Sequence, residues 1–183
     1  MKKAHWTIAG LALASLAGAG CFLISGQFII DFALGNINVT SSTGLDGVIV
    51  DLNTVGDYSK HKDKLKGLAD IALLGTFVNN TTASAIDVEV WMVDNAGPVL
   101  TDATVVRADG VRVWGPFHVD AGGTTTITWD QSAILFGAGK AAMLAQVKGD
   151  GIFTLYAIGP SGSTTYDFSI NDGKLVAVID AGP

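Results

Sequence analysis

The sequence predicts an all-β protein, built as an antiparallel β-sandwich with one or two short helices. Three observations lead to this prediction. Apolar and polar residues alternate from Ile86 to Met92, which is typical of a strand with one buried face. Further β segments recur at intervals of about 8–12 residues, and glycine-rich turns separate them. In addition, 49% of the 183 residues are hydrophobic, which is enough for one buried core.

The first elements of the predicted domain are short strands followed by a helix. Residues 27–34 form a first strand in which Phe28, Ile30 and Phe32 stand at alternate positions, and residues 35–40 and 47–52 form two further β segments. Asp57 is a residue type that caps helix N-termini, and Gly67 is one that follows helix C-termini. We therefore expect a short helix between them.

The middle of the chain carries the most regular β pattern. Residues 71–78 are apolar on both faces, which predicts a central strand covered from two sides. Residues 79–82 are Asn and Thr, which favour turns, and the alternating segment 86–93 follows. These two segments are expected to pair as a β-hairpin.

The second half is expected to alternate between strands and short helical pieces. A hairpin around Ala108-Asp109-Gly110 and a second one around Asn171-Asp172-Gly173 are predicted from their turn residues. The remaining expected elements are a strand at 124–129, a helical turn at 130–136, a helix at 140–147 and a strand at 153–158. Together the strands are immunoglobulin-like in general form, and their order is not predicted.

The first 20 residues have the layout of an export signal. Lys2 and Lys3 form a positive start, residues 8–16 are apolar, and residues 17–20 are small. The following residue, Cys21, is the only cysteine of the chain, so no intramolecular disulfide can form.

Cys21 directly after Ala19-Gly20 resembles the lipobox of bacterial lipoproteins. The resemblance covers the signal segment alone, and Gly18 stands where that motif usually has Leu. It implies cleavage before Cys21, diacylation of its thiol, and usually acylation of the new amino terminus. Because Phe22 is not the Asp associated with inner-membrane retention in some lipoproteins, the resemblance also implies the outer membrane.

Two other fates of the signal remain open. Ala17-x-Ala19 also fits the ordinary signal peptidase, which would release a secreted or periplasmic protein. Residues 6–24 are nearly free of polar side chains and could stay as an uncleaved anchor. In the lipoprotein reading, residues 1–20 are the signal, 21–26 a lipidated tether and 27–183 the β-sandwich domain.

The charge of the chain argues against a nucleic-acid partner. The formal net charge is −6 with 11 basic and 17 acidic residues. Lys2 and Lys3 leave with the signal, so nine basic residues face the same 17 acidic ones, a balance of −8. A nucleic-acid-binding protein normally presents a basic face instead.

No motif predicts a catalytic residue, a metal site or a cofactor. His61 and His118 lie on separate predicted elements and lack zinc-binding spacing, and His118 is expected to be a partly buried strand residue. Gly137-Ala138-Gly139-Lys140 lacks the other residues of a phosphate loop. The sequence therefore predicts a protein that is not an enzyme, although scattered carboxylates keep an exported hydrolase or carbohydrate-active enzyme as the alternative.

Two features are candidates for contact with partners. Trp91 lies on the face of its strand opposite the apolar one, where it could bind an envelope protein, a glycan or a second copy of the chain. Alternatively the helix at 58–66 or the helix at 140–147 covers it. The second feature consists of four lysines that could contact an anionic group or form an ordinary solvated helix face: Lys60, Lys62, Lys64 and Lys66. The predicted function is an envelope lipoprotein, attached to the membrane through Cys21, with a binding or structural domain.

Overall fold

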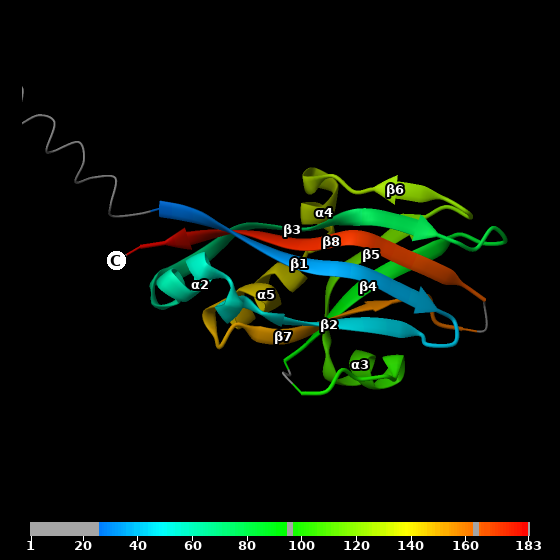
Figure 1. Ribbon diagram of the computed structural model, residues 1–183, viewed down its shortest axis with the longest axis horizontal. Helices are drawn as coiled ribbons and strands as arrows, with labels where there is room; N and C mark the ends of the chain where they lie inside the picture. The colour runs from blue at the N-terminus through cyan, green and yellow to red at the C-terminus, as the bar shows by residue number, and fades with distance from the viewer. Residues whose placement is uncertain (1–25, 95–96, 163–164, 183) are drawn as a thin grey trace, which may run out of the picture.

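The computed structural model describes residues 26–94, 97–162 and 165–182. Its strands form two four-stranded antiparallel sheets that pack face to face (Figure 1). Sheet A has the order β1 (Gly26–Thr40), β8 (Asp167–Ala181), β3 (Leu65–Asn79) and β6 (Thr124–Thr126). Sheet B has the order β2 (Leu45–Asp51), β7 (Ile152–Ile158), β4 (Ile86–Val93) and β5 (Val111–Val119). The predicted all-β antiparallel sandwich is confirmed.

The strands pair as a long hairpin that has been rolled up. β1 pairs with β8, β2 with β7, β3 with β6 and β4 with β5, and successive pairs alternate between the two sheets. This nested order of eight strands defines a jelly roll. The sequence predicted the two packed sheets of this sandwich. It did not predict the order of the strands.

The predicted hairpin of residues 71–78 and 86–93 is wrong. Both segments are strands, but β3 lies in sheet A and β4 in sheet B, so the segment between them crosses from one sheet to the other. The buried side chain of Asn79 fixes this crossing, since its amide nitrogen donates to the carbonyl oxygens of Ser84 at 2.9 Å and Asp120 at 3.0 Å. A turn composition between two strands does not by itself decide that they pair.

The predicted hairpin at residues 171–173 is also wrong, because β8 runs through these residues as one strand. Its register against β1 shifts here, and Gly35 lies opposite Gly173. Asp172 and Gly35 both have positive φ, of 53° and 73°. The backbone nitrogen of Asp172 donates to Asn36 at 3.0 Å. The turn-forming residues therefore make a pair of matched irregularities that lets two long strands stay together.

The third predicted hairpin, around residues 108–110, is replaced by a helix and a strand. Helix α3 spans Ala103–Asp109, and β5 begins at Val111. The side chain of Asp102 caps α3 by accepting a hydrogen bond from the nitrogen of Thr104 at 2.7 Å. The β-branched residues of α3 favour a strand locally, but this cap and the complete burial of Val106 favour the helix.

The other helices are α2 (Gly56–His61), α4 (Trp129–Leu135) and α5 (Gly139–Lys148), with 3-10 turns at η1 (Leu52–Thr54) and η2 (Lys62–Lys64). The described residues thus contain four short α-helices where one or two were expected. α4 and α5 agree with the prediction, although the cap of α4 is Thr128 and the strand before it stops at Thr126. The helix predicted to reach Gly67 ends at His61, because β3 begins at Leu65 and pairs with β8.

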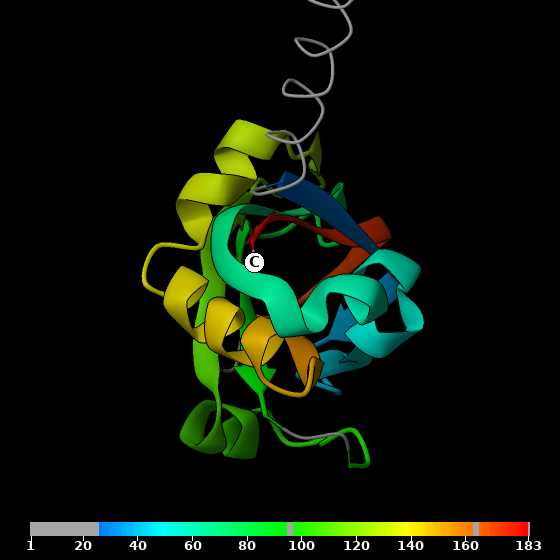
Figure 2. The same cartoon turned by 90° about the vertical axis from the view of Figure 1, so that its left-hand side faces the viewer.

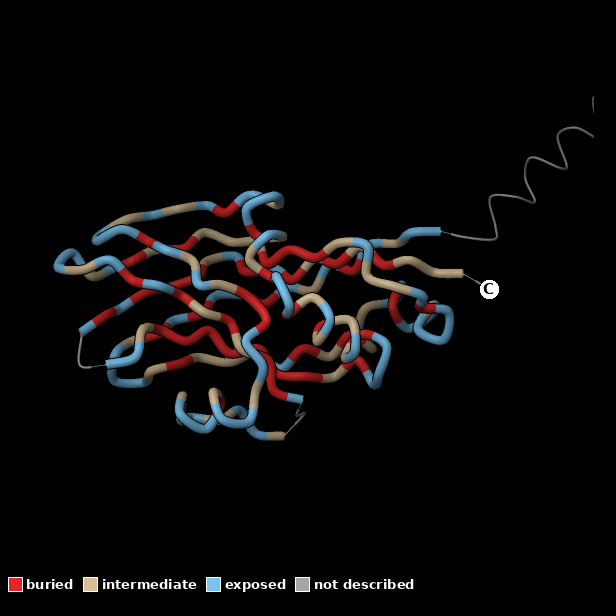
Figure 3. The backbone as a smooth tube through the Cα atoms, turned by 180° about the vertical axis from the view of Figure 1, so that it is seen from behind, coloured by how far each residue is buried: buried red, intermediate tan, exposed pale blue. Residues whose placement is uncertain are grey.

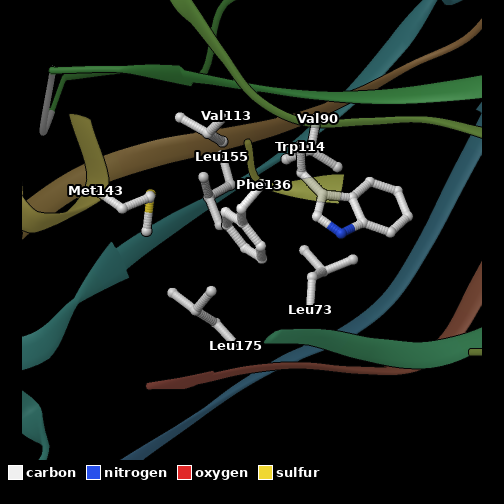
Figure 4. Close-up of a pocket in the computed structure, with 8 residues that line it drawn as sticks. All are labelled: Leu73, Val90, Val113, Trp114, Phe136, Met143, Leu155 and Leu175. Atoms are coloured by element: carbon white, nitrogen blue, oxygen red, sulfur yellow. The ribbon is translucent and has the colours of Figure 1, made fainter. Parts of the chain in front are cut away.

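The core lies between the two sheets and continues beneath α4 and α5. Figure 3 shows buried segments alternating with exposed ones along the strands, while the loops at both ends are largely exposed. Trp114 is fully buried and stacks on Phe77 with their ring centroids 5.5 Å apart. Figure 4 shows Trp114, Phe136 and Met143 converging with aliphatic side chains from both sheets. The gap among these side chains has no room for a water molecule, so it is packed core and not a ligand site.

The hydroxyl of Ser132 on α4 connects the two sheets. This side chain is completely buried; its oxygen accepts from the nitrogen of Leu73 at 2.8 Å and donates to the carbonyl oxygen of Leu73 at 2.7 Å. It also accepts from the indole nitrogen of Trp114 at 3.0 Å. Because Leu73 is in sheet A and Trp114 in sheet B, one hydroxyl fixes the position of α4 against both.

The carboxylate of Asp70 on β3 fixes the starts of α4 and α5. It accepts from the indole nitrogen of Trp129 at 2.7 Å and from the Lys140 ammonium at 2.9 Å. The hydrogen bond from Lys140 is the main reason that the pKa of Asp70 is lowered, and partial burial opposes it. This stabilisation is present above the ordinary pKa of the carboxyl group and is lost as the pH falls through the lowered pKa.

We predict that Ser132→Ala lowers the free energy of unfolding by about 1–3 kcal/mol, because the buried nitrogen of Leu73 loses a partner. Urea denaturation with an unchanged m-value is the measurement. Ser59→Ala is the matched control, since Ser59 is exposed and makes one hydrogen bond, to Asn53; we expect a loss below about 0.5 kcal/mol. Equal losses for the two variants would contradict the role assigned to Ser132.

Candidate functional site

Trp91 lies on the outer face of sheet B, as the alternation of its strand predicts. Its neighbours Val90 and Met92 point into the main core, whereas Trp91 packs against a second, smaller apolar cluster. That cluster consists of Leu45, Val93, Val106, Tyr156 and Ile158. The indole is therefore only partly exposed.

Helix α3 covers this cluster, and not the helix at 58–66 or at 140–147 that the sequence suggested. Val106 of α3 belongs to the cluster, and the hydroxyl of Tyr156 accepts a hydrogen bond from the nitrogen of Leu100 at 2.9 Å. The reason for the correction is that residues 103–109 are a helix and not the predicted strand, so they can lie across the sheet.

Three charged residues surround the polar edge of Trp91. The Glu89 carboxylate, only 20% exposed, accepts from the indole nitrogen of Trp91 at 3.1 Å and from the guanidinium of Arg112. A nitrogen of Arg107 lies 4.0 Å from the same carboxylate and donates to the carbonyl oxygen of Gly159 at 2.9 Å. We call Glu89, Trp91, Arg107 and Arg112 the Trp91 cluster.

The Trp91 cluster combines a fixed aromatic ring with spare hydrogen-bond donors. Arg112 has 47% of its side-chain surface exposed, so part of its guanidinium fork faces solvent. Two arginines around one glutamate leave an excess of one positive charge within a strongly acidic chain. Such an arrangement suits a carboxylate or another planar anionic group, which arginine binds through paired hydrogen bonds.

The four lysines singled out in the sequence do not share a helix face. Lys60 is in α2, Lys62 and Lys64 are in η2, and Lys66 is in β3. All four are exposed, and Lys60 makes an exposed ion pair with Asp57 at 3.5 Å. The elements that carry them lie at the end of the sandwich at which β1 begins, and this end faces the viewer in Figure 2. Leu65 and Gly26 both have Ala181 as a strand partner, which places this end of β3 next to that of β1 across β8.

The opposite end carries an arrangement around His118 that the sequence analysis missed. The expectation that His118 is partly buried is wrong, since 62% of its side-chain surface is exposed. Its Nδ1 lies 2.9 Å from a carboxylate oxygen of Asp87, and its Nε2 lies 3.6 Å from one of Asp120. The two strands bring Asp87 and His118 together as register partners, and sequence spacing contains no signal for that register.

Other kinds of site were sought within residues 26–94, 97–162 and 165–182. In these ranges no group of three or more His, Cys, Asp or Glu side chains could hold a metal ion. No helix among the described residues is long and apolar enough to cross a membrane. Cys21, the predicted lipidation site, lies outside the described residues.

Comparison with known proteins does not provide a family. No family model matches the chain, and no curated protein matches it. Among solved structures, one similar chain comes from the cryo-EM structure of Mud crab tombus-like virus. The TM-score is 0.39 at 12% identity, over 87% of this chain and 81% of the other.

A second similar structure is dimeric latent PorU from Porphyromonas gingivalis, with a TM-score of 0.30 at 6% identity. That alignment covers 87% of this chain but only 13% of the PorU chain. Similarities this weak say nothing about function, and the description of this protein as a β-sandwich domain comes from its own strand pairing.

We predict that the pKa of His118 lies above its ordinary value of 6.5, chiefly because Asp87 is hydrogen-bonded to its ring. A raised folded-state pKa adds stability that is complete below the unfolded pKa and is lost as the pH rises through the raised value. Titration of the imidazole by NMR measures it, and Asp87→Asn should move the midpoint back toward 6.5. Asp130→Asn is the control, because Asp130 is an exposed residue of α4. A midpoint that does not change in Asp87→Asn contradicts the assignment.

Proposed function

We propose that this protein is an exported, lipid-anchored protein of the bacterial cell envelope whose β-sandwich binds a partner or has a structural role and catalyses no reaction. The observation that carries the proposal is the placement of Cys21. It follows Ala19-Gly20 directly, ends a segment with the layout of an export signal, and is the sole cysteine of the chain. One modification, acylation of the thiol, accounts for all three facts.

The use of the ionisable side chains supports a role other than catalysis. Glu89 is held by Arg112 and Trp91, and Asp70 by Lys140 and Trp129. Both carboxylates thus neutralise positive charges and fix neighbouring elements. A general acid or base instead needs a proton-transfer partner at the reacting group and a pKa near the working pH, whereas the pKa of Asp70 is lowered.

Within this function, the Trp91 cluster is the surface that we propose for the partner. Tryptophan and arginine are the residue types that most often dominate binding energy at protein interfaces. The hydrogen bond from Trp91 to Glu89 and the ion pair of Arg112 hold both side chains in place before any partner arrives. Such preorganisation lowers the entropy cost of binding. The partner would be an envelope protein, a glycan that bears carboxylates, or a second copy of the chain.

The proposed location is the outer membrane in a cell that has one, since Phe22 and not Asp follows the cysteine. Stable attachment needs more than one acyl chain, because each buried CH₂ contributes only about 0.8 kcal/mol. A cysteine that is diacylated on sulfur and acylated on its new amino terminus meets this requirement.

We predict that Cys21→Ser abolishes lipid labelling, because serine lacks the thiol that accepts the diacylglyceryl group. The variant should accumulate as uncut precursor, or be cut after Ala19 and leave the membrane fraction. Metabolic labelling with a fatty acid and mass spectrometry of the amino terminus are the measurements. Ser25→Ala, four residues further on, is the control and should keep the label. A wild-type protein that begins at Gly20 with an unmodified thiol would overturn the lipid anchor.

We predict that Arg112→Ala weakens partner binding by at least about tenfold, because the exposed guanidinium fork is lost. Self-association is measured by analytical ultracentrifugation, and glycan binding by co-sedimentation with purified, insoluble cell-wall glycan. Lys174→Ala is the matched control, since Lys174 is half exposed and lies in sheet A. Equal effects of the two changes would contradict the proposed surface, and turnover of the glycan would favour the alternative of a carbohydrate-active enzyme.

A further inference from the structure

The end of the sandwich at which β1 begins differs in charge from the rest of the domain. The five lysines in the elements at this end are Lys60, Lys62, Lys64, Lys66 and Lys148, the last of which donates to the carbonyl oxygen of Lys66. The acidic residues in the same elements or bonded to them are Asp51, Asp57, Asp63, Asp150 and Asp180. Since these charges balance, the whole excess of eight negative charges beyond residue 26 lies elsewhere, where four basic residues face twelve acidic ones. We call this end the lysine end.

The lysines and the aspartates of the lysine end differ in their partners and in the length of their side chains. Asp51 accepts hydrogen bonds from Asn53, Asp150 accepts from the nitrogen of Ile152, and Asp180 accepts from Gln27. Lys62 and Lys64 are exposed on η2, which they share with the exposed Asp63, and Lys62 also donates to Asn53 at 3.5 Å. Long lysine side chains also extend further from the backbone than short aspartates do. With five lysines against five aspartates, this end is close to neutral, and the excess negative charge lies on the rest of the domain.

The chain leaves the sandwich at the lysine end. Gly26 is paired with Ala181, and the backbone nitrogen of Gly182 donates to the carbonyl oxygen of Lys64 at 3.1 Å. Only five peptide steps separate Gly26 from Cys21 in the sequence, and an extended chain covers about 17 Å in that number of steps. A lipid on Cys21 thus holds this end within a short distance of the bilayer.

We propose that the lysine end rests on an anionic bilayer surface and holds the sandwich upright, with the His118 end directed away from the membrane. This inference rests on the proposed lipid anchor and adds the orientation of the domain. An anionic bilayer attracts lysines within a Debye length of its surface and repels acidic faces. The rest of the domain carries the excess negative charge, and the lysine end is the part nearest the proposed anchor, so this end can approach such a bilayer with little repulsion.

Orientation can be measured by energy transfer from the far end of the domain to the membrane. β1 has 15 residues, so the upright domain places its far loops about 50 Å from the lysine end. Ala83→Cys introduces a labelling site in an exposed far loop, and the acylated Cys21 does not compete for the label. The labelled, acylated full protein is placed in vesicles with acceptor-labelled head groups, either of phosphatidylcholine or with about 30% phosphatidylglycerol added.

In anionic vesicles we expect low transfer for the wild-type surface, and at least about a twofold rise when Lys62→Gln and Lys64→Gln are combined. About 0.5 M salt should also raise transfer in the unmodified protein, because it screens the attraction. Thr82→Asp with Ala121→Asp lowers the net charge by the same two units at the far end, and transfer should stay low. In vesicles of phosphatidylcholine alone, all forms of the protein should show the same energy transfer.

Equal transfer for the wild type and the lysine variant in anionic vesicles would overturn the orientation, even with the anchor intact. Mass spectrometry of the same samples tests the anchor separately. If the protein proves to be unacylated, the proposed function fails. Flotation of the unacylated protein with anionic vesicles then tests whether the lysine end contacts the bilayer without an anchor. Stronger vesicle binding by the wild type than by the lysine variant supports this contact, and equal binding overturns it.

Discussion

The hydrogen bonds of the buried Ser132 hydroxyl are the interaction on which the arrangement of this domain depends. They join β3 of one sheet, β5 of the other and the helix between them. They also satisfy the indole nitrogen of Trp114, the largest fully buried side chain of the core. A tryptophan can be buried at the centre of a sandwich only if its polar nitrogen finds a partner. The indole nitrogen also donates to the carbonyl oxygen of Ser132 at 3.1 Å, so this residue provides both acceptors that accompany the stacking of Trp114 on Phe77.

Buried and partly buried polar groups elsewhere serve the same purpose. Asp70 fixes α4 and α5, Asn79 fixes the crossing between the sheets, and Glu89 fixes Trp91 beside α3. In each case a hydrogen bond to a charged or amide group replaces water that burial removes. These polar groups therefore have a structural role in the fold.

The two ends of the sandwich present different surfaces, and the topology explains why. In this jelly roll the paired strands run antiparallel, so the segments that connect them gather at two opposite ends. One end collects the lysines of α2, η2 and the start of β3 together with Gly26. The other collects the loops around His118 and Asp120 and includes no Lys or Arg between residues 79 and 86 or between 118 and 124. A protein tethered at one end can thus present the other to its surroundings.

The sequence by itself determined the properties that depend on local periodicity. Alternation identified β4 and the outer position of Trp91, and a run of good helix formers identified α5, because each of these signals lies within about ten residues. Only the tertiary structure decided which strands pair. Partners such as Gln27 and Asp180 are 153 positions apart, and their pairing is set by the simultaneous burial of both sheets. The two wrong predictions for residues 171–173 and 103–109 have the same reason. Residues 171–173 continue a strand because Gly35 bends opposite them, and residues 103–109 form a helix because Val106 is buried there. The Trp91 cluster likewise draws on three elements, and no spacing along one chain could reveal it.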